Sequence, residues 1–135
     1  MTAQITPPRG PEFARILSVG SYRPARIVTN AEICTRIDST DEWIRERSGI
    51  VERRYAADDE SVIDMAVWAA EDAIAKAGIA SADIGLVMLA SITYPYLSPA
   101  AAPQIAVRIG ATGAAAVDIS SACAGFCYGI SMASD

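Results

Sequence analysis

The sequence contains no histidine and only three cysteines: Cys34, Cys123 and Cys127. Two cysteines in a C-x-x-x-C pair make a poor ligand set without histidine or further cysteines, so we expect no metal site. The first fifteen residues contain no apolar segment of the kind found in secretory signals. An odd number of cysteines in such a chain indicates free thiols in a reducing compartment, and we expect a cytoplasmic protein.

Positive charge is also scarce, because 11 Lys and Arg residues face 16 Asp and Glu residues, which gives a net charge of −5. Nucleic acids and anionic membrane surfaces attract basic proteins, so we expect neither as a partner. The Ala- and Gly-rich stretch at 109–133 contains Asp118 and no leucine. Since charge at bilayer depth is costly, we interpret this stretch as a buried strand and helix and not as a membrane span.

The apolar pattern predicts a single α/β unit. Apolar residues make up 52% of the chain, which is ample for one core. Continuous apolar runs predict buried strands at 14–19, 85–90 and 114–119, with a short one at 27–28. Capping residues and glycines bound predicted helices at 31–37, 41–48, 61–77 and 100–109, and another begins at 121. This alternation is typical of a mixed, mostly buried sheet with helices on its faces.

The segment 118–129 (DISSACAGFCYG) is the most informative one for function. It predicts a buried strand, a sharp turn, and Cys123 at the start of a helix. The helix dipole favours a thiolate there, and free backbone N–H groups of the first turn can support an oxyanion. From this placement alone, a buried structural cysteine is an equally good interpretation, since free cysteines are often buried. We predict that Cys34 and Cys127 are core residues.

Trp43 and Arg47 lie four residues apart and therefore share one face of the predicted helix 41–48. An indole and a guanidinium together can sandwich a flat base, and arginine can also meet phosphates, as coenzyme A (CoA) would require. The alternative, favoured by these residues alone, is that Trp43 covers the core while Arg47 pairs with an acidic residue. Ser98 lies in a loop at 93–99 that either lines a pocket or interface or is a plain surface turn.

Several segments together resemble β-ketoacyl-ACP synthase III of type II fatty-acid synthesis, where ACP is acyl carrier protein. These segments are G-S-Y-R-P at 20–24, V-T-N at 28–30, D-E-W-I at 41–44 followed by Arg47 and Gly49, A-P-Q-I at 102–105 and S-A-C-A-G-F at 121–126. They occur in the family's order and at its spacing. The resemblance implies a thiolase-like fold. We expect a flexible leader at 1–13 and the N-terminal thiolase-like domain at 14–135, truncated before the C-terminal half.

The resemblance also implies roles for single residues. Cys123 would accept an acyl group from acyl-CoA, and the acyl-enzyme would then condense with malonyl-ACP with loss of CO2. Trp43 and Arg47 would stack on the CoA adenine, and Ser39 would contact the nucleotide end. Ser98 would lie on a loop that crosses the interface of a homodimer and shapes the partner's acyl pocket. Acyl-CoA is then a substrate, and no cofactor is expected.

One departure from the family concerns the His and Asn of its C-terminal half, which polarise the malonyl thioester. This sequence has no histidine, so we expect that the 135 residues by themselves do not carry out the condensation. Alternatives within the superfamily are a polyketide starter-unit synthase and a 3-hydroxy-3-methylglutaryl-CoA synthase-like enzyme. A non-catalytic truncated homologue that acts through the dimer interface is a further alternative. A redox or metal-binding protein that uses Cys123 and Cys127 is the least favoured.

Overall fold

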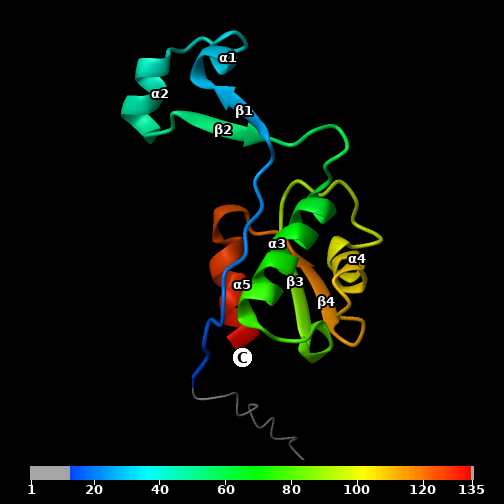
Figure 1. Ribbon diagram of the computed structural model, residues 1–135. Coiled ribbons are helices and arrows are strands. Elements are labelled where there is room, and N and C mark those ends of the chain that lie inside the picture. Colours follow the sequence, from blue (N-terminus) through cyan, green and yellow to red (C-terminus); the bar gives the residue numbers. More distant parts are fainter. Residues whose placement is uncertain (1–12, 135) are drawn as a thin grey trace, which may run out of the picture.

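The structure is a computed structural model that describes residues 13–134, so the leader predicted at 1–13 lies outside the described residues except for Phe13. A smaller part contains β1 (Arg26–Thr29), α1 (Asn30–Cys34), α2 (Asp41–Ser48) and β2 (Glu52–Tyr55). A larger part contains α3 (Val62–Ala77), β3 (Leu86–Ala90), α4 (Ala101–Arg108), β4 (Ala115–Ile119) and α5 (Gly125–Ser134), with 3-10 turns at Ser81–Asp83 and Ala122–Ala124 (Figure 1).

The larger part is built on the parallel pair β3–β4. Successive side chains of a strand point to opposite faces of its sheet. Val87 and Leu89 pack against the core that lies under α3 and α4. On the opposite face, α5 approaches so closely that a Cβ on Gly125 would lie 3.2 Å from the Cβ of Ala90. The sheet therefore lies between α3 and α4 on one side and α5 on the other.

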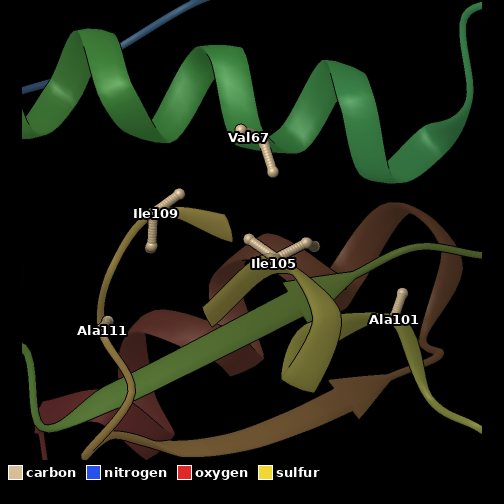
Figure 2. Packing of buried hydrophobic residues seen from close by; sticks show 5 residues of the cluster. All are labelled: Val67, Ala101, Ile105, Ile109 and Ala111. Carbon is tan, nitrogen blue, oxygen red and sulfur yellow. The ribbon is translucent and has the colours of Figure 1, made fainter. Parts of the chain in front are cut away.

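The core of the larger part is made of small and branched apolar side chains. Its buried residues are Val67, Ala101, Ile105, Ile109 and Ala111. Figure 2 shows Val67 pointing from α3 toward Ile105 of α4. The strands beneath are only half-buried. The continuous apolar runs predicted fully buried strands, so the described residues cover the sheet less than expected.

The N-terminus of α3 is held by a capping box between Ser61 and Asp64, and Asp64 also binds Arg108 of α4 with an Nη1–Oδ1 distance of 2.6 Å. The Ser61 side chain, and after it Arg108, lowers the pKa of Asp64 to about 2. A carboxylate at this end of a helix also meets the favourable end of the dipole. One acidic side chain therefore caps α3 and ties it to α4.

The smaller part contains a strand that the sequence pattern did not predict. β2 has the sequence ERRY, without apolar alternation, and pairs antiparallel with β1 so that Ile27 lies opposite Arg54. Backbone pairing defines this strand, since most of its side chains are exposed. Apart from the strand predicted at 14–19, the other predicted elements occur within a few residues of their expected bounds, and the helix predicted at 31–37 ends early, at Cys34.

The strand predicted at 14–19 is wrong, because residues 13–24 form no strand. The segment instead runs along α3 (Figure 1), and the Ser18 hydroxyl donates to the Ala73 carbonyl at 2.7 Å. Ile16 and Val19 remain 71% and 74% exposed. A strand needs a neighbouring strand for its backbone hydrogen bonds, and the described residues place none beside this segment. None of the described helices combines the length and the apolar character needed to cross a membrane.

Gly20 is the point of closest approach between this segment and α3, which yields a stability prediction. A Cβ at Gly20 would lie 2.0 Å from the Ala69 carbonyl oxygen and 2.4 Å from the Ala73 nitrogen. We expect Gly20→Ala to lower the free energy of unfolding by about 1–3 kcal/mol, as overpacking does. Urea denaturation measures this change. Gly113→Ala is the matched control, because a Cβ there meets nothing within 4 Å, and equal effects of the two changes would contradict the prediction.

Candidate functional site

Cys123 lies in a sharp turn between a strand and a helix. β4 ends at Ile119, and Cys123 is the central residue of the 3-10 turn that leads directly into α5. Ala122, just before it, has a φ of 44° and is the one residue other than glycine with positive φ among residues 13–134. A left-handed conformation costs an L-residue roughly 1–2 kcal/mol, and such strain gathers at functional sites. The Cys123 side chain is exposed at this turn.

The turn is fixed by hydrogen bonds on both sides and by close packing at Gly125, just after it. The Ser91 amide donates to the Ile119 carbonyl at 3.1 Å, and the Ala124 amide donates to the Ser121 carbonyl at 3.0 Å. Immediately after the turn, Gly125 is buried against the sheet. A larger residue would not fit at Gly125, because a Cβ there would already lie 3.2 Å from the Cβ of Ala90.

Asp118 is a site residue that the sequence analysis did not assign to any role. Its carboxylate accepts hydrogen bonds from the backbone amides of Ala101 at 2.8 Å and Ala102 at 2.7 Å. It thereby caps α4, whose own N-cap residue, Ala100, has no side chain that could accept. Two features of the sequence could have indicated this role of Asp118. One is a charged residue inside an apolar strand, and the other is a predicted helix that starts without a capping residue. Asp118 fixes the position of the loop 91–100 next to the end of β4.

That loop and the end of β4 border a cavity of about 580 Å3. Tyr94, Tyr96 and Leu97 line it from the loop, and residues 116–120 line it from β4 and the residue that follows it. The two tyrosine rings meet edge to face at 5.7 Å. Ser98, predicted to lie on a loop that shapes the partner's acyl pocket across a dimer interface, is exposed on this loop and does not line the cavity of its own chain.

The other two cysteines differ from the prediction that both lie in the core. Cys34 is half-buried at the end of α1, and Cys127 is exposed. Two positions along a helix correspond to a rotation of about 200°, so Cys127 faces away from the sheet when Gly125 faces it. The expectation that Cys127 is buried is therefore wrong. Across residues 13–134, no cluster of three His, Cys, Asp or Glu side chains could hold a metal ion.

Trp43 lies at a second cavity, on the smaller part of the molecule. Thr40 caps α2 and its hydroxyl accepts the Trp43 amide at 3.1 Å, which orients the first turn of the helix. Trp43 is 56% exposed, and the cavity of about 370 Å3 beside it is lined by Ile37, Asp38, Ser39, Thr40 and Trp43. The hydroxyl oxygen of Ser39 is buried and has no hydrogen-bond partner among the described residues.

Arg47 lies one turn after Trp43 on α2 and is exposed. No ion pair within residues 13–134 involves it, although Arg45 on the same helix pairs with Asp41. The interpretation in which Trp43 covers the core and Arg47 pairs with an acidic residue is therefore wrong. The structure brings Ser39 and Trp43 to one cavity, leaves Arg47 exposed one turn further along α2 and outside the lining, and places Cys123 in the larger part.

The positive φ of Ala122 predicts an unusual response to glycine. Ala122→Gly removes the Cβ that makes this conformation costly, so we expect it to leave the free energy of unfolding unchanged or to raise it by up to about 1 kcal/mol. Ala124→Gly, in the same turn but without positive φ, should lower it by about 0.5–1 kcal/mol. Urea denaturation of both variants compares them. A similar destabilisation by both would show that Ala122 is not strained.

The comparisons with known proteins agree on one family, although no family model matches the sequence. The mycobacterial β-ketoacyl-[acyl-carrier-protein] synthase III of Mycolicibacterium paratuberculosis is 52% identical over 132 residues, which cover 98% of this chain and 39% of that protein. The β-ketoacyl-[acyl-carrier-protein] synthase III of Streptomyces glaucescens is 49% identical over 131 residues, or 97% of this chain and 39% of that protein. The chain thus spans about two-fifths of the length of these relatives.

Solved structures show the same relationship in three dimensions. The priming β-ketosynthase of the R1128 polyketide biosynthetic pathway matches with a TM-score of 0.89 and 44% identity, over 98% of this chain and 40% of that one. The 3-oxoacyl-[acyl-carrier-protein] synthase III of Aquifex aeolicus matches with a TM-score of 0.82 and 36% identity, over 87% of this chain and 38% of that one. Sequence and fold together show that the chain belongs to the β-ketoacyl-ACP synthase III family, whose N-terminal portion it matches, and that it has a thiolase-like fold.

Proposed function

We propose that this chain supplies the acyl-accepting part of a β-ketoacyl-ACP synthase III, with Cys123 as the nucleophile. The observation that carries the proposal is the strained turn that presents an exposed Cys123 between the end of β4 and the start of α5. A strand–turn–helix elbow of this kind exposes a nucleophile and leaves backbone N–H groups beside it free to bind an oxyanion. Names of relatives at about 50% identity support the same function.

In the first half-reaction, the Cys123 thiolate attacks the carbonyl carbon of acyl-CoA. A carbon–sulfur bond to Cys123 forms, the bond to the CoA sulfur breaks, and the CoA thiolate takes up the proton released from the Cys123 thiol. The products are acyl-Cys123 and free CoA. Splitting the overall reaction through a covalent thioester divides one difficult step into two easier ones.

In the second half-reaction, malonyl-ACP loses CO2 and its α-carbon attacks the carbonyl of acyl-Cys123. The Cys123 sulfur leaves, and β-ketoacyl-ACP is released. The sequence has no histidine, so a histidine that polarises the malonyl thioester has to come from residues outside these 135. We therefore propose ACP as a partner of a site that contains both Cys123 and such a histidine, and not of Cys123 alone.

We assign recognition of CoA to the exposed face of α2. The Trp43 ring is accessible for stacking on adenine, and a guanidinium such as that of Arg47 binds phosphate groups well. The buried Ser39 hydroxyl has a free hydrogen-bonding capacity beside the same cavity. These three residues supply an aromatic face, a positive charge and a neutral donor, which are the groups that a nucleotide end requires.

A polyketide starter-unit synthase is the second candidate, because a priming β-ketosynthase of a polyketide pathway matches 98% of this chain with a TM-score of 0.89. The two candidates share the Cys123 chemistry and differ in the acyl donor, so donor preference separates them. A homodimer in the cytoplasm, with Ser98 near the interface, remains part of the proposal for both.

Acyl transfer from radiolabelled acetyl-CoA tests the role of Cys123. We expect Cys123→Ser to abolish covalent labelling, because the hydroxyl is a far weaker nucleophile than the thiolate. Cys34→Ser and Cys127→Ser serve as matched controls and should both retain the label, which peptide mapping locates. If only Cys127→Ser lost the label, the nucleophile would be Cys127, and the assignment to Cys123 would be wrong. An unlabelled parent protein would favour a non-catalytic homologue.

Isothermal titration with CoA tests the role of α2. We expect Trp43→Ala and Arg47→Ala each to raise the Kd for CoA about tenfold, the size of a lost cation–π or charge-assisted contact. Alkylation of Cys123 by iodoacetamide should keep its rate, since Cys123 lies in the other part of the molecule. Lys76→Ala removes the same charge from α3 and should leave the Kd unchanged. An unaltered Kd in both α2 variants would remove α2 from the CoA site.

A further inference from the structure

Asn30 is the buried polar side chain in the core of the smaller part, with 1% of its surface exposed. Its amide nitrogen donates to the Asp41 carboxylate at 2.7 Å and to the Ile50 carbonyl at 2.8 Å. Its amide oxygen accepts from Nη2 of Arg53 at 2.7 Å. Two of the three partners are charged, and hydrogen bonds to charged groups are the stronger ones.

These partners come from three different places in the smaller part. Asn30 begins α1, Asp41 begins α2, Ile50 follows the end of α2, and Arg53 belongs to β2. One side chain therefore holds both ends of α2 and joins them to the hairpin strand. Asp41 is further bound by Arg45 of the same helix, and the Arg45 and Asn30 hydrogen bonds together lower the pKa of Asp41.

Asn30 does not line the cavity beside Trp43. Its partner Asp41 lies midway in the sequence between Ser39 and Trp43. These two residues of the proposed CoA site do line the cavity. Any shift of Asp41 therefore moves the start of α2 and, with it, the spacing between the Ser39 hydroxyl and the Trp43 ring. Asn30 therefore acts on this cavity through its hydrogen-bond partners, of which Asp41 is the one closest to Ser39 and Trp43 in the sequence.

We propose that Asn30 is a positioning residue for acyl-CoA, which holds α2 in the orientation that lets Ser39, Trp43 and Arg47 recognise the nucleotide end. This inference rests on the proposed function of α2. It is supported by the high cost of leaving buried polar groups unpaired. Nη1 of Arg53 is already buried without a partner among the described residues, so loss of the Asn30 oxygen would leave the guanidinium still less satisfied.

An exchange of the two side chains tests the inference. Asn30→Asp replaces the donor that faces Asp41 with a second carboxylate, and we expect the Kd for CoA to rise about tenfold or more. The double variant Asn30→Asp/Asp41→Asn restores one donor and one acceptor, and the new carboxylate can still accept from Arg53. We expect it to recover most of the affinity. Kd is measured by isothermal titration with CoA in buffer without urea. Circular dichroism first checks that each variant is folded under these conditions.

Two readouts separate positioning from simple stabilisation. The iodoacetamide reaction of Cys123 should keep its rate in all variants. Ser18→Ala, which removes a hydrogen bond from the larger part, should lower stability without changing the Kd for CoA. Should Asn30→Asp not fold, Arg53→Gln tests the same network from β2, with an expected rise in Kd of about threefold; an unchanged Kd there would overturn the inference.

The outcomes for the inference and for the proposed function are distinct. If Trp43→Ala weakens CoA binding and Asn30→Asp does not, the role of Asn30 is wrong and the CoA site on α2 stands. If neither variant weakens binding, the assignment of α2 itself fails. Equal loss of affinity in Asn30→Asp and in the double variant would also overturn the inference, because restoring the donor–acceptor pair would then have no effect.

Discussion

The parallel pairing of β3 with β4 is the constraint on which the placement of Cys123 depends. The register runs from Leu86 opposite Ala115 to Ala90 opposite Ile119 and fixes where β4 stops relative to β3. Side-chain alternation then directs one face to α3 and α4 and the other to α5. A shift of one residue would exchange the two faces and move the turn that carries Cys123 away from the sheet edge. The buried core under α3 and α4 therefore stabilises the register, and the register positions the nucleophile.

Two features hold the end of the sheet next to the helices: the hydrogen bonds of Asp118 and the missing side chain of Gly125. Asp118 binds the first amides of α4 from the end of β4, so a helix start and a strand end are held by one carboxylate. Three residues after β4 ends, backbone strain at Ala122 turns the chain sharply before α5. Gly125 allows α5 to lie directly on β3. A reactive thiol at a strained turn needs such support, because local strain persists only where the surrounding structure over-determines it.

Most elements could be predicted from the sequence because their signals are local. Ser61, Thr40 and Gly49 mark helix ends through capping and left-handed geometry, and the structure has those ends where the residues indicate. The turn at Cys123 was likewise predicted from small residues between a strand and a helix. The strand β2 could not be predicted, because charged residues define it only through pairing with β1. Asp118 and Asn30 could not be assigned either, since their partners lie far away in sequence and become neighbours only after folding.

The failed predictions have a common physical origin. The apolar run at 14–19, Cys127 and the outer side of α5 all have sequence patterns typical of burial, yet Ile16 and Phe126 are largely exposed. Apolar surface is stabilising when it leaves water, by about 25 cal/mol per Å2, so such patterns indicate burial in the folded protein as a whole. The relatives are more than twice as long as this chain. Residues 13–134 leave apolar side chains exposed at 14–19 and on α5, and these are the positions where the sequence pattern predicts burial that the described residues do not supply.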